Sequence, residues 1–280
     1  MPHDKKLFEL LKRLAPRLGK MALPYYGKIE STTKSIRVHD RVHESPVTAI
    51  DHCLQELVLA ELVMHGYTDV AFNGEEDTHL QFFFPHSFER EKGITVHCDP
   101  IDGTLSYVRG DNRFAVGFGL SRYVEGKHHF FGTVIYSPLE DDLFWAFENE
   151  KSSHTREKNI PRTIAARRRF TQPIKDKLQD AGYRLVNPGN AHLGIVDVAL
   201  GRVGAAFYSA HVHDVLIPFA FAANHGVFPL DEKGKRMDPF ELPITNGHFS
   251  RIPIINYFAS KEIQEELMPI LQNPNYIKKQ

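Results

Sequence analysis

Two carboxylates stand three residues apart in one short string, Asp99-Pro100-Ile101-Asp102-Gly103-Thr104. The apolar run at 94–98 before it is typical of a buried strand, and a carboxylate at the carboxyl end of a strand points into the crevice where α/β proteins bind ligands. Pro100 stiffens the turn, and Gly103 lets the backbone come close to a ligand. We expect Gly103 and Thr104 to open a helix whose free amides hold a phosphate.

Two further acidic segments have similar settings. Gly74-Glu75-Glu76 follows a short predicted strand at 70–73, and Asp214 lies between a predicted strand and an apolar helix. Acidic groups that meet in one crevice raise one another's pKa, and a bound divalent cation relieves this cost. Oxygen ligands without cysteine favour Mg²⁺ or Mn²⁺ over Zn²⁺. Two plainer interpretations stay open, because a Glu-Glu pair is often solvated surface and Asp214 alone suits a helix cap.

Helices and strands alternate along the chain and position these residues. We predict a first helix over 4–18 and a second over 46–65, with Ser45 as its cap and Asp51 near its start. The other predicted elements are strands at 113–122, 128–136 and 143–147, a crossing at 148–169, a helix at 190–200, a strand at 203–208, a helix at 214–224 that Pro218 distorts, a strand at 254–259 and a helix at 261–271. This order favours an α/β layered sandwich with an antiparallel sheet in its first half.

Composition narrows the class of protein. The chain has 280 residues, of which 42% are hydrophobic, and this is enough for a sizeable core. A formal net charge of -1 gives no general reason to expect nucleic acid or an anionic membrane as partner. Cys53 and Cys98 do not make a disulfide framework, so we expect a reducing cytoplasm. We find no apolar run long enough for a signal peptide or a membrane span.

Four segments, taken in order, resemble the inositol monophosphatase family of metal-dependent, lithium-sensitive phosphatases. Val47-Thr48-Ala49-Ile50-Asp51 looks like the family's Val-Thr-x-x-Asp, and Gly74-Glu75-Glu76 like its Gly-Glu-Glu. The string from Asp99 to Thr104 is the family's central signature in full. His213-Asp214 stands where the family usually has Trp-Asp. The resemblance spans residues 40–258, which is most of the chain.

The resemblance implies that most of these acidic residues bind Mg²⁺, as two or three ions, with Mn²⁺ as a possible substitute. The implied ligands are Glu75, Asp99 and the Ile101 carbonyl for one ion, Asp99, Asp102 and Asp214 for a second, and Glu76 in the outer shell or at a weaker third site.

The resemblance also implies a catalytic set of Asp51, Thr104 and Glu75, in which Thr104 paired with Asp51 orients and helps to deprotonate the attacking water. The phosphate would be received by the segment 101–104. A metal ion that lowers the pKa of a bound water supplies the nucleophile, and a second stabilises the alkoxide that leaves, so that no phosphoenzyme is required.

The residues expected to select the alcohol depart from the family pattern. The segment 187–191 aligns with the substrate loop, and there Gly189, Asn190 and Ala191 are expected to bind substrate, with Asn190 in place of a usual Thr or Ser. The stretch 207–213 lacks the glutamate that reads sugar hydroxyls in inositol-specific relatives. We also place His213 and Asp214 at the substrate.

The resemblance implies a small polyol or sugar monophosphate as the substrate, with inositol 1-phosphate as the default. A nucleotide 3′-phosphate, histidinol phosphate or fructose 1,6-bisphosphate is the alternative within the superfamily. A different class stays open, a weakly active regulatory or RNA-associated protein on the same fold, and the altered pocket and the basic run at 156–169 motivate it.

Histidines suggest a second metal hypothesis. On a strand His211 and His213 share one face, and with Asp214 they would make a Zn²⁺ site. That site has no third histidine at a clear spacing and leaves the string at 99–104 unexplained. The plainer interpretation is that both histidines line or pack in a pocket wall.

For the fold, the resemblance implies the five-layer α-β-α-β-α sandwich of the inositol monophosphatase and fructose-1,6-bisphosphatase type. We expect an N-terminal half, 1–150, that carries most metal ligands, and a C-terminal half, 151–280, that carries the last metal aspartate and the substrate loop. The resemblance further implies a homodimer, by analogy only.

Overall fold

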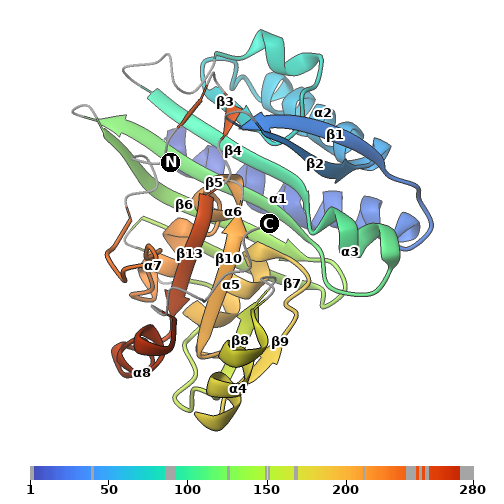
Figure 1. The fold of residues 1–280 in the computed structure, drawn as a ribbon. Coiled ribbons are helices and arrows are strands. Elements are labelled where there is room, and N and C mark those ends of the chain that lie inside the picture. Colours follow the sequence, from blue (N-terminus) through green and yellow to red (C-terminus); the bar gives the residue numbers. More distant parts are fainter. Residues whose placement is uncertain are drawn as a thin grey trace.

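The two larger β-sheets and three sets of helices form layers in the order α-β-α-β-α (Figure 1). The computed structural model describes residues 3–38, 41–85, 93–124, 127–148, 150, 152–166, 170–210, 212–237, 244–245, 248–249 and 252–271. The layered α/β sandwich expected from the sequence is confirmed. Each layer buries its apolar side against the next, and this places three hydrophobic clusters between the layers.

The first sheet has five strands in the order β3-β4-β5-β6-β7. The strands are β3 (Ala71–Gly74), β4 (Gly93–Asp102), β5 (Ala115–Val124), β6 (Lys127–Ser137) and β7 (Asp142–Phe147). β3 runs parallel to β4, and the other neighbours are antiparallel. The antiparallel sheet predicted for the first half is thus confirmed, with one parallel strand at its edge.

Two long helices cover the outer face of this sheet. The first, α1 (His3–Ala22), buries the leucine stripe that predicted it and runs beyond the predicted 4–18. The second, α2 (Ala49–Met64), begins later than predicted. Ser45 and Pro46 belong to a strand, so the prediction that they cap and open the helix is wrong, and Thr48 is the cap.

Helices α5 (Ala191–Ala199), α6 (Val212–Leu216) and α7 (Phe219–Asn224) fill the layer between the sheets. All residues of α5 are buried, because both of its sides face a sheet. The helix predicted over 214–224 is divided in two. Pro218 lies at the N-cap of α7, where its missing amide breaks no helical hydrogen bond.

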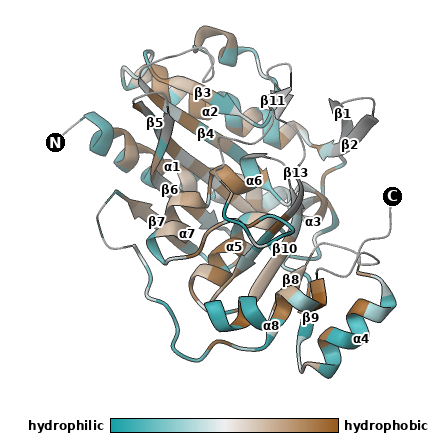
Figure 2. Cartoon of the chain, turned by 60° about the vertical axis from the view of Figure 1, so that its left-hand side comes forward, coloured by the Kyte–Doolittle hydropathy of each residue, from teal (hydrophilic) through white to brown (hydrophobic). Residues whose placement is uncertain are grey.

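The second sheet has the order β13-β10-β8-β9. Its strands are β8 (Thr163–Ala166), β9 (Arg184–Val186), β10 (Ala205–Ala210) and β13 (Ile252–Phe258), and α4 (Gln172–Asp180) and α8 (Lys261–Leu271) belong to the outer layer. Figure 2 shows hydrophilic residues along α4 and α8, which each turn only one side to the core. The predicted crossing over 148–169 therefore contains a strand that the sequence did not suggest.

Smaller elements complete the described chain. They are the hairpin β1 (Thr32–Val38) and β2 (Arg41–Val47), the helix α3 (Thr104–Arg109), the 3-10 turns Leu23–Tyr25 (η1) and Leu80–Phe83 (η2), and the short pair β11 (Ile244–Thr245) and β12 (His248–Phe249). None of the helices in the described part of the chain is long and apolar enough to cross a membrane.

Candidate functional site

Parallel pairing of β3 and β4 brings two acidic segments together. Gly74, the last residue of β3, pairs with Cys98, and the next residues are Glu75, just after β3, and Asp99, still within β4. The amide of Glu75 donates to the carbonyl of Cys98 over 2.9 Å. Segments 24 residues apart in the sequence thereby place two carboxylates side by side.

The turn that carries Glu75 and Glu76 is held by α2. Gln55 is fully buried, and its side-chain oxygen accepts from the Glu76 amide over 3.1 Å while its amide donates to the Glu76 carbonyl. A Cβ on Gly74 would collide with Gln55, so only glycine permits this close approach. Glu76 is itself buried.

The segment Asp99–Thr104 is shaped by short-range hydrogen bonds. The register of β4 against β5 shifts between Asp99 and Asp102, and inside this bulge the Ile101 amide donates to Asp99 Oδ1 over 3.1 Å. The hydroxyl of Thr104 lies 3.0 Å from the Ile101 carbonyl. Gly103 has φ +91, and its Cα lies so close to Asn190 that a Cβ would be 2.8 Å from the Asn190 Cβ. The predicted helix start is confirmed as α3.

Asp51 reaches this segment from the start of α2. Its carboxylate accepts from the Thr48 amide over 2.8 Å and from the Thr48 hydroxyl, and Thr48 accepts in turn from the helix amides, which makes a capping box. The other carboxylate oxygen lies 3.4 Å from the Thr104 hydroxyl. The predicted pair of Asp51 and Thr104 is therefore in contact, with Asp51 buried and Thr104 half-buried.

The start of α5 binds the other end of the acidic string. The amides of Ala191 and His192 donate to the two carboxylate oxygens of Asp102, over 3.4 Å and 2.6 Å. Asn190 caps the helix by accepting from the Leu193 amide over 2.8 Å. The Asn190 side chain is thus occupied by the helix cap, and the Ala191 amide is directed at Asp102.

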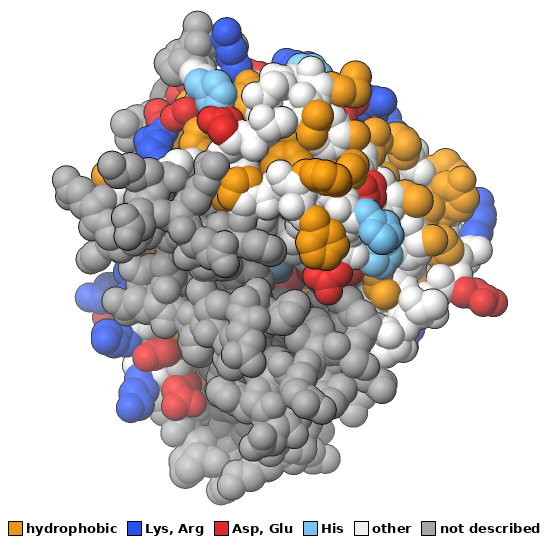
Figure 3. Space-filling model, turned by 90° about the horizontal axis from the view of Figure 1, so that it is seen from above, with side chains coloured by type: hydrophobic (Ala, Val, Ile, Leu, Met, Phe, Trp, Pro, Cys, Tyr) orange, Lys and Arg blue, Asp and Glu red, His pale blue; other side chains and the backbone are white. Residues whose placement is uncertain are grey.

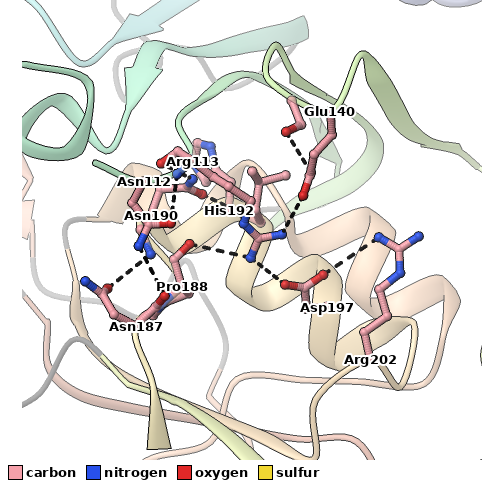
Figure 4. Close-up of polar contacts among 12 residues, drawn as sticks. Asn112, Arg113, Glu140, Asn187, Pro188, Asn190, His192, Asp197 and Arg202 are labelled. Atoms are coloured by element: carbon pink, nitrogen blue, oxygen red, sulfur yellow. Dashed lines mark hydrogen bonds and ion pairs between the residues drawn. The ribbon is translucent and has the colours of Figure 1, made fainter. Parts of the chain in front are cut away.

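Arg113 holds the loop before α5 in place (Figure 4). Its guanidinium contacts Asp197 at 2.6 Å and Glu140 at 3.4 Å, and its carbonyl accepts from the Asn190 side chain over 3.1 Å. Gly189, with φ +82, comes too close to the Arg113 carbonyl for any Cβ. The predicted substrate loop is consequently tied to the start of β5.

The acidic groups gather around Asp99. Burial raises the pKa of Asp99 well above its usual range, and the charges of Glu75, Asp102 and Asp214 raise it further. Asp99 Oδ2 is buried and makes no hydrogen bond. A divalent cation fits this donor set, because it would satisfy the buried oxygen and offset the repulsion between the carboxylates.

A histidine that we did not single out from the sequence also enters this cluster. Ligand atoms of Asp99, His192 and Asp214 all lie within 4.8 Å of one another, which makes them a candidate metal-binding group among the described residues. The sequence could have drawn attention to His192, because it is an ionisable residue at the start of an apolar helix. It also lies two residues after Asn190, which was expected to bind substrate.

The histidines of the second hypothesis lie differently. His213 is buried on α6, next to Asp214, and its carbonyl lies 3.4 Å from His192 Nε2. His211 is outside the described residues, as are the three arginines at 167–169 of the basic run. His213 thus lies on a helix and not on the strand that the zinc hypothesis assumed, and the rest of that hypothesis, which includes His211, stays untested.

Comparison with solved structures identifies the type of fold. An inositol monophosphatase-fructose 1,6-bisphosphatase aligns with a TM-score of 0.70 and 20% identity, over 96% of this chain and 100% of that one. The layered phosphatase architecture expected from the sequence is confirmed. A model of the inositol monophosphatase family matches residues 4–216, and the chain belongs to this family. Its members are metal-dependent phosphatases, the class of enzyme that the sequence predicted.

Curated relatives carry several different activities. An inositol-1-monophosphatase of Bacillus subtilis is 31% identical over 53% of this chain, and the match spans 57% of that protein. A 3′(2′),5′-bisphosphate nucleotidase, CysQ, of Escherichia coli is 26% identical over 65% of this chain and 81% of its own length. The Nus factor SuhB of Xylella fastidiosa is 24% identical over 84% of this chain and 86% of its own. Family membership therefore leaves the substrate open.

Proposed function

We propose that this protein hydrolyses a small phosphate monoester with the help of Mg²⁺ or Mn²⁺. The observation that carries the proposal is the burial of Asp99 among Glu75, Asp102 and Asp214, with one carboxylate oxygen left without a hydrogen bond. Such a cluster is costly without a cation. Glu75, Asp99, Asp102, Asp214 and the Ile101 carbonyl would hold the ions, with Glu76 behind them.

Bound ions would lower the pKa of a coordinated water and neutralise charge on the phosphoryl oxygens. The chain itself orients that water. Asp51 is held by Thr48 and lies 3.4 Å from the Thr104 hydroxyl. The Thr104 hydroxyl also lies 3.0 Å from the Ile101 carbonyl, and once an ion engages that carbonyl the hydroxyl would donate to Asp51 and accept a hydrogen bond from water, so that Thr104 would pass the water's proton toward the Asp51 carboxylate.

The start of α3 and the loop 188–191 form the opposite walls of the proposed substrate site. The backbone of Gly103 and Thr104 would bind the phosphate, and that of Gly189, Asn190 and Ala191 the alcohol. By analogy with the family, we expect a small polyol or sugar monophosphate, with inositol 1-phosphate tested first.

A panel of phosphate esters tests the proposal. Purified protein is incubated with inositol 1-phosphate, a nucleoside 3′,5′-bisphosphate, histidinol phosphate and fructose 1,6-bisphosphate, and phosphate release is measured with Mg²⁺, with Mn²⁺ and with EDTA. We expect cation-dependent release from at least one ester and no release by Asp99→Asn. Equal release in EDTA would refute a metal-dependent reaction.

A regulatory role is the second candidate. It is favoured by the likeness to a Nus factor over 84% of the chain. The two roles separate in one purified sample: no release from any ester with either cation, together with specific retention of RNA at physiological salt, would favour the regulator. RNA retained only at low salt would be unspecific charge attraction.

We also propose, by analogy with the family, that the protein is a cytoplasmic homodimer. Figure 3 shows hydrophobic side chains gathered on the face at the top of Figure 1. Phe82, Phe83 and Met64 are large apolar side chains that are 80%, 77% and 78% exposed. Light scattering behind gel filtration gives the mass directly. A Phe82→Ser, Phe83→Ser double variant that stays dimeric would exclude these two phenylalanines from the interface.

A further inference from the structure

His192 is a buried side chain beside the acidic cluster, and the proposed reaction leaves it unused. Its ring has no solvent exposure, its Nε2 lies 3.9 Å from Asp99 Oδ2, and its Nδ1 lies 3.4 Å from Asp102 Oδ2. Neither Asp99 Oδ2 nor His192 Nδ1 makes a hydrogen bond. Asp99 Oδ2 is thus a buried acceptor without a hydrogen bond, and the ring nitrogen nearest to it is Nε2, which also lies 3.4 Å from the His213 carbonyl.

The chain makes room for this ring. Gly117 on β5 is the direct partner of Asp99 on β4, and a Cβ at position 117 would lie 2.7 Å from both Cε1 and Nδ1 of His192. The imidazole therefore packs against bare strand backbone beside Asp99. A side chain at position 117 would push the ring away from the carboxylates.

Ligand spacing agrees with a shared ion. An ion bound about 2.1 Å from each of two ligand atoms holds them at most about 4.2 Å apart. The Asp99 to His192 separation of 3.9 Å lies within this limit, and Asp214 lies within 4.8 Å of both, so a small adjustment completes the group.

We propose that His192 is a nitrogen ligand of the ion held by Asp99 and Asp214, and that this nitrogen makes the centre prefer a first-row transition cation such as Mn²⁺ over Mg²⁺. The inference rests on the proposed metal centre and adds to it the identity of one ligand and the order of ion preference. Imidazole suits transition metals, whereas Mg²⁺ takes oxygen ligands and keeps its waters. The remaining carboxylates keep the site open to either ion.

Pulsed EPR of bound Mn²⁺ tests the ligand without any assay of activity. We expect a ¹⁴N coupling in the Mn²⁺-loaded wild type, and a ¹⁵N coupling in its place when the protein is made with ¹⁵N-histidine. His192→Ala should lose the coupling, weaken Mn²⁺ binding by about 10- to 100-fold and change Mg²⁺ binding by much less. Gly117→Ala keeps the histidine but displaces it, and should weaken the coupling. His65→Gln, an exposed histidine at the end of α2, is the matched control and should change nothing.

The outcomes separate the two proposals. Stoichiometric Mn²⁺ without a nitrogen coupling, or a coupling that survives in His192→Ala, overturns the role of His192 and leaves the metal centre intact. Absence of Mn²⁺ and Mg²⁺ binding in the wild type overturns the metal centre itself. The isotope experiment uses the wild-type protein, so a variant that fails to fold does not prevent the test.

Discussion

The two walls of the proposed site are built in different ways. The first wall is the segment 99–104, and the second is the segment 188–192. At the end of β4, Asp99, Ile101 and Thr104 are shaped by bonds between residues two or three apart, and the residue types match the family signature in full. At the start of α5, Asn190 and His192 are placed by bonds to residues 77 and 90 positions away, and the residue types depart from the family pattern.

We connect this difference with two separate tasks of the site, which are the reaction itself and the choice of the ion and the alcohol. A short acidic string whose turn is shaped by its own hydrogen bonds can keep one reaction, even though Asp102 and Thr104 also contact α5 and α2. A wall positioned by distant partners can change through several residues that fit together, as His192 and Gly117 do. We infer that the first wall performs the reaction and that the second chooses the ion and the alcohol.

The largest effect is expected from a substitution of Asp99, which is the proposed metal ligand at the centre of the first wall. Asp99→Asn should lower kcat/KM by roughly 10³-fold or more, because an amide does not supply the charge that holds the ion. The matched control is Asp77→Asn, an exposed aspartate just after Glu76, which should stay close to wild type. Comparable losses of kcat/KM in both variants would contradict the proposed role of Asp99 as a metal ligand.

Breaking the support of the second wall should have the next largest effect. Arg113→Met removes the contact with Asp197, whose side chain is only 10% exposed, and should cost about 2–3 kcal/mol of unfolding free energy. The loosened loop should also raise KM more than it lowers kcat. Urea unfolding and steady-state kinetics measure both. Arg109→Met, an exposed arginine on α3, serves as control, and a change in kcat alone would contradict the assigned role of the loop.

Removal of metal should make stability depend on pH through the first wall. Since the pKa of Asp99 is raised in the folded protein, the folded state binds more protons above the ordinary aspartate pKa, and metal-free stability falls as pH rises through the raised value. In EDTA, Asp99→Asn should therefore melt above wild type at neutral pH, by about 2–4 °C for an effect near 1 kcal/mol. Calorimetry at pH 5 and pH 8 measures the difference, which should shrink at the lower pH. A wild type that gains stability in EDTA between these two values would contradict the cluster.

The smallest expected effect concerns the support of Asp51. Thr48→Ala removes the helix cap and should cost about 1 kcal/mol. The freed Asp51 should also lower kcat by a few-fold, whereas Thr48→Ser, which keeps the hydroxyl, should restore both. A loss of stability without any change in kcat would show that the cap does not position Asp51.

Much of the fold was predictable because its patterns are local. The leucine stripe of α1, the helix α8 at 261–271 and the strands of the first sheet all follow from periodicity. The start of α2 was misjudged because Ser45 and Pro46 also suit a helix entry, and pairing with β1 decided otherwise. β8 has four residues and β9 has three, and both gain their stability from the sheet. Their own sequences are therefore too short to predict a strand by periodicity.

For the site, the sequence indicated which residues lie together. Asp51 and Thr104 are in contact, and Glu75, Asp102 and Asp214 surround Asp99. Their individual roles stay predictions until the variants are measured. Asn190 was expected at the substrate, but its side chain serves as the cap of α5.

By itself, the sequence determined the acidic string at 99–104, the layered α/β architecture and the family. Each of these can be recognised from neighbouring residues or from the periodic spacing of apolar residues. Only the tertiary structure decided that His192 enters the acidic cluster and that Gly117 leaves space for its ring. The physical reason is that both depend on contacts between β4, β5 and α5, and a side chain's distance to partners some 75 to 93 residues away is set by packing.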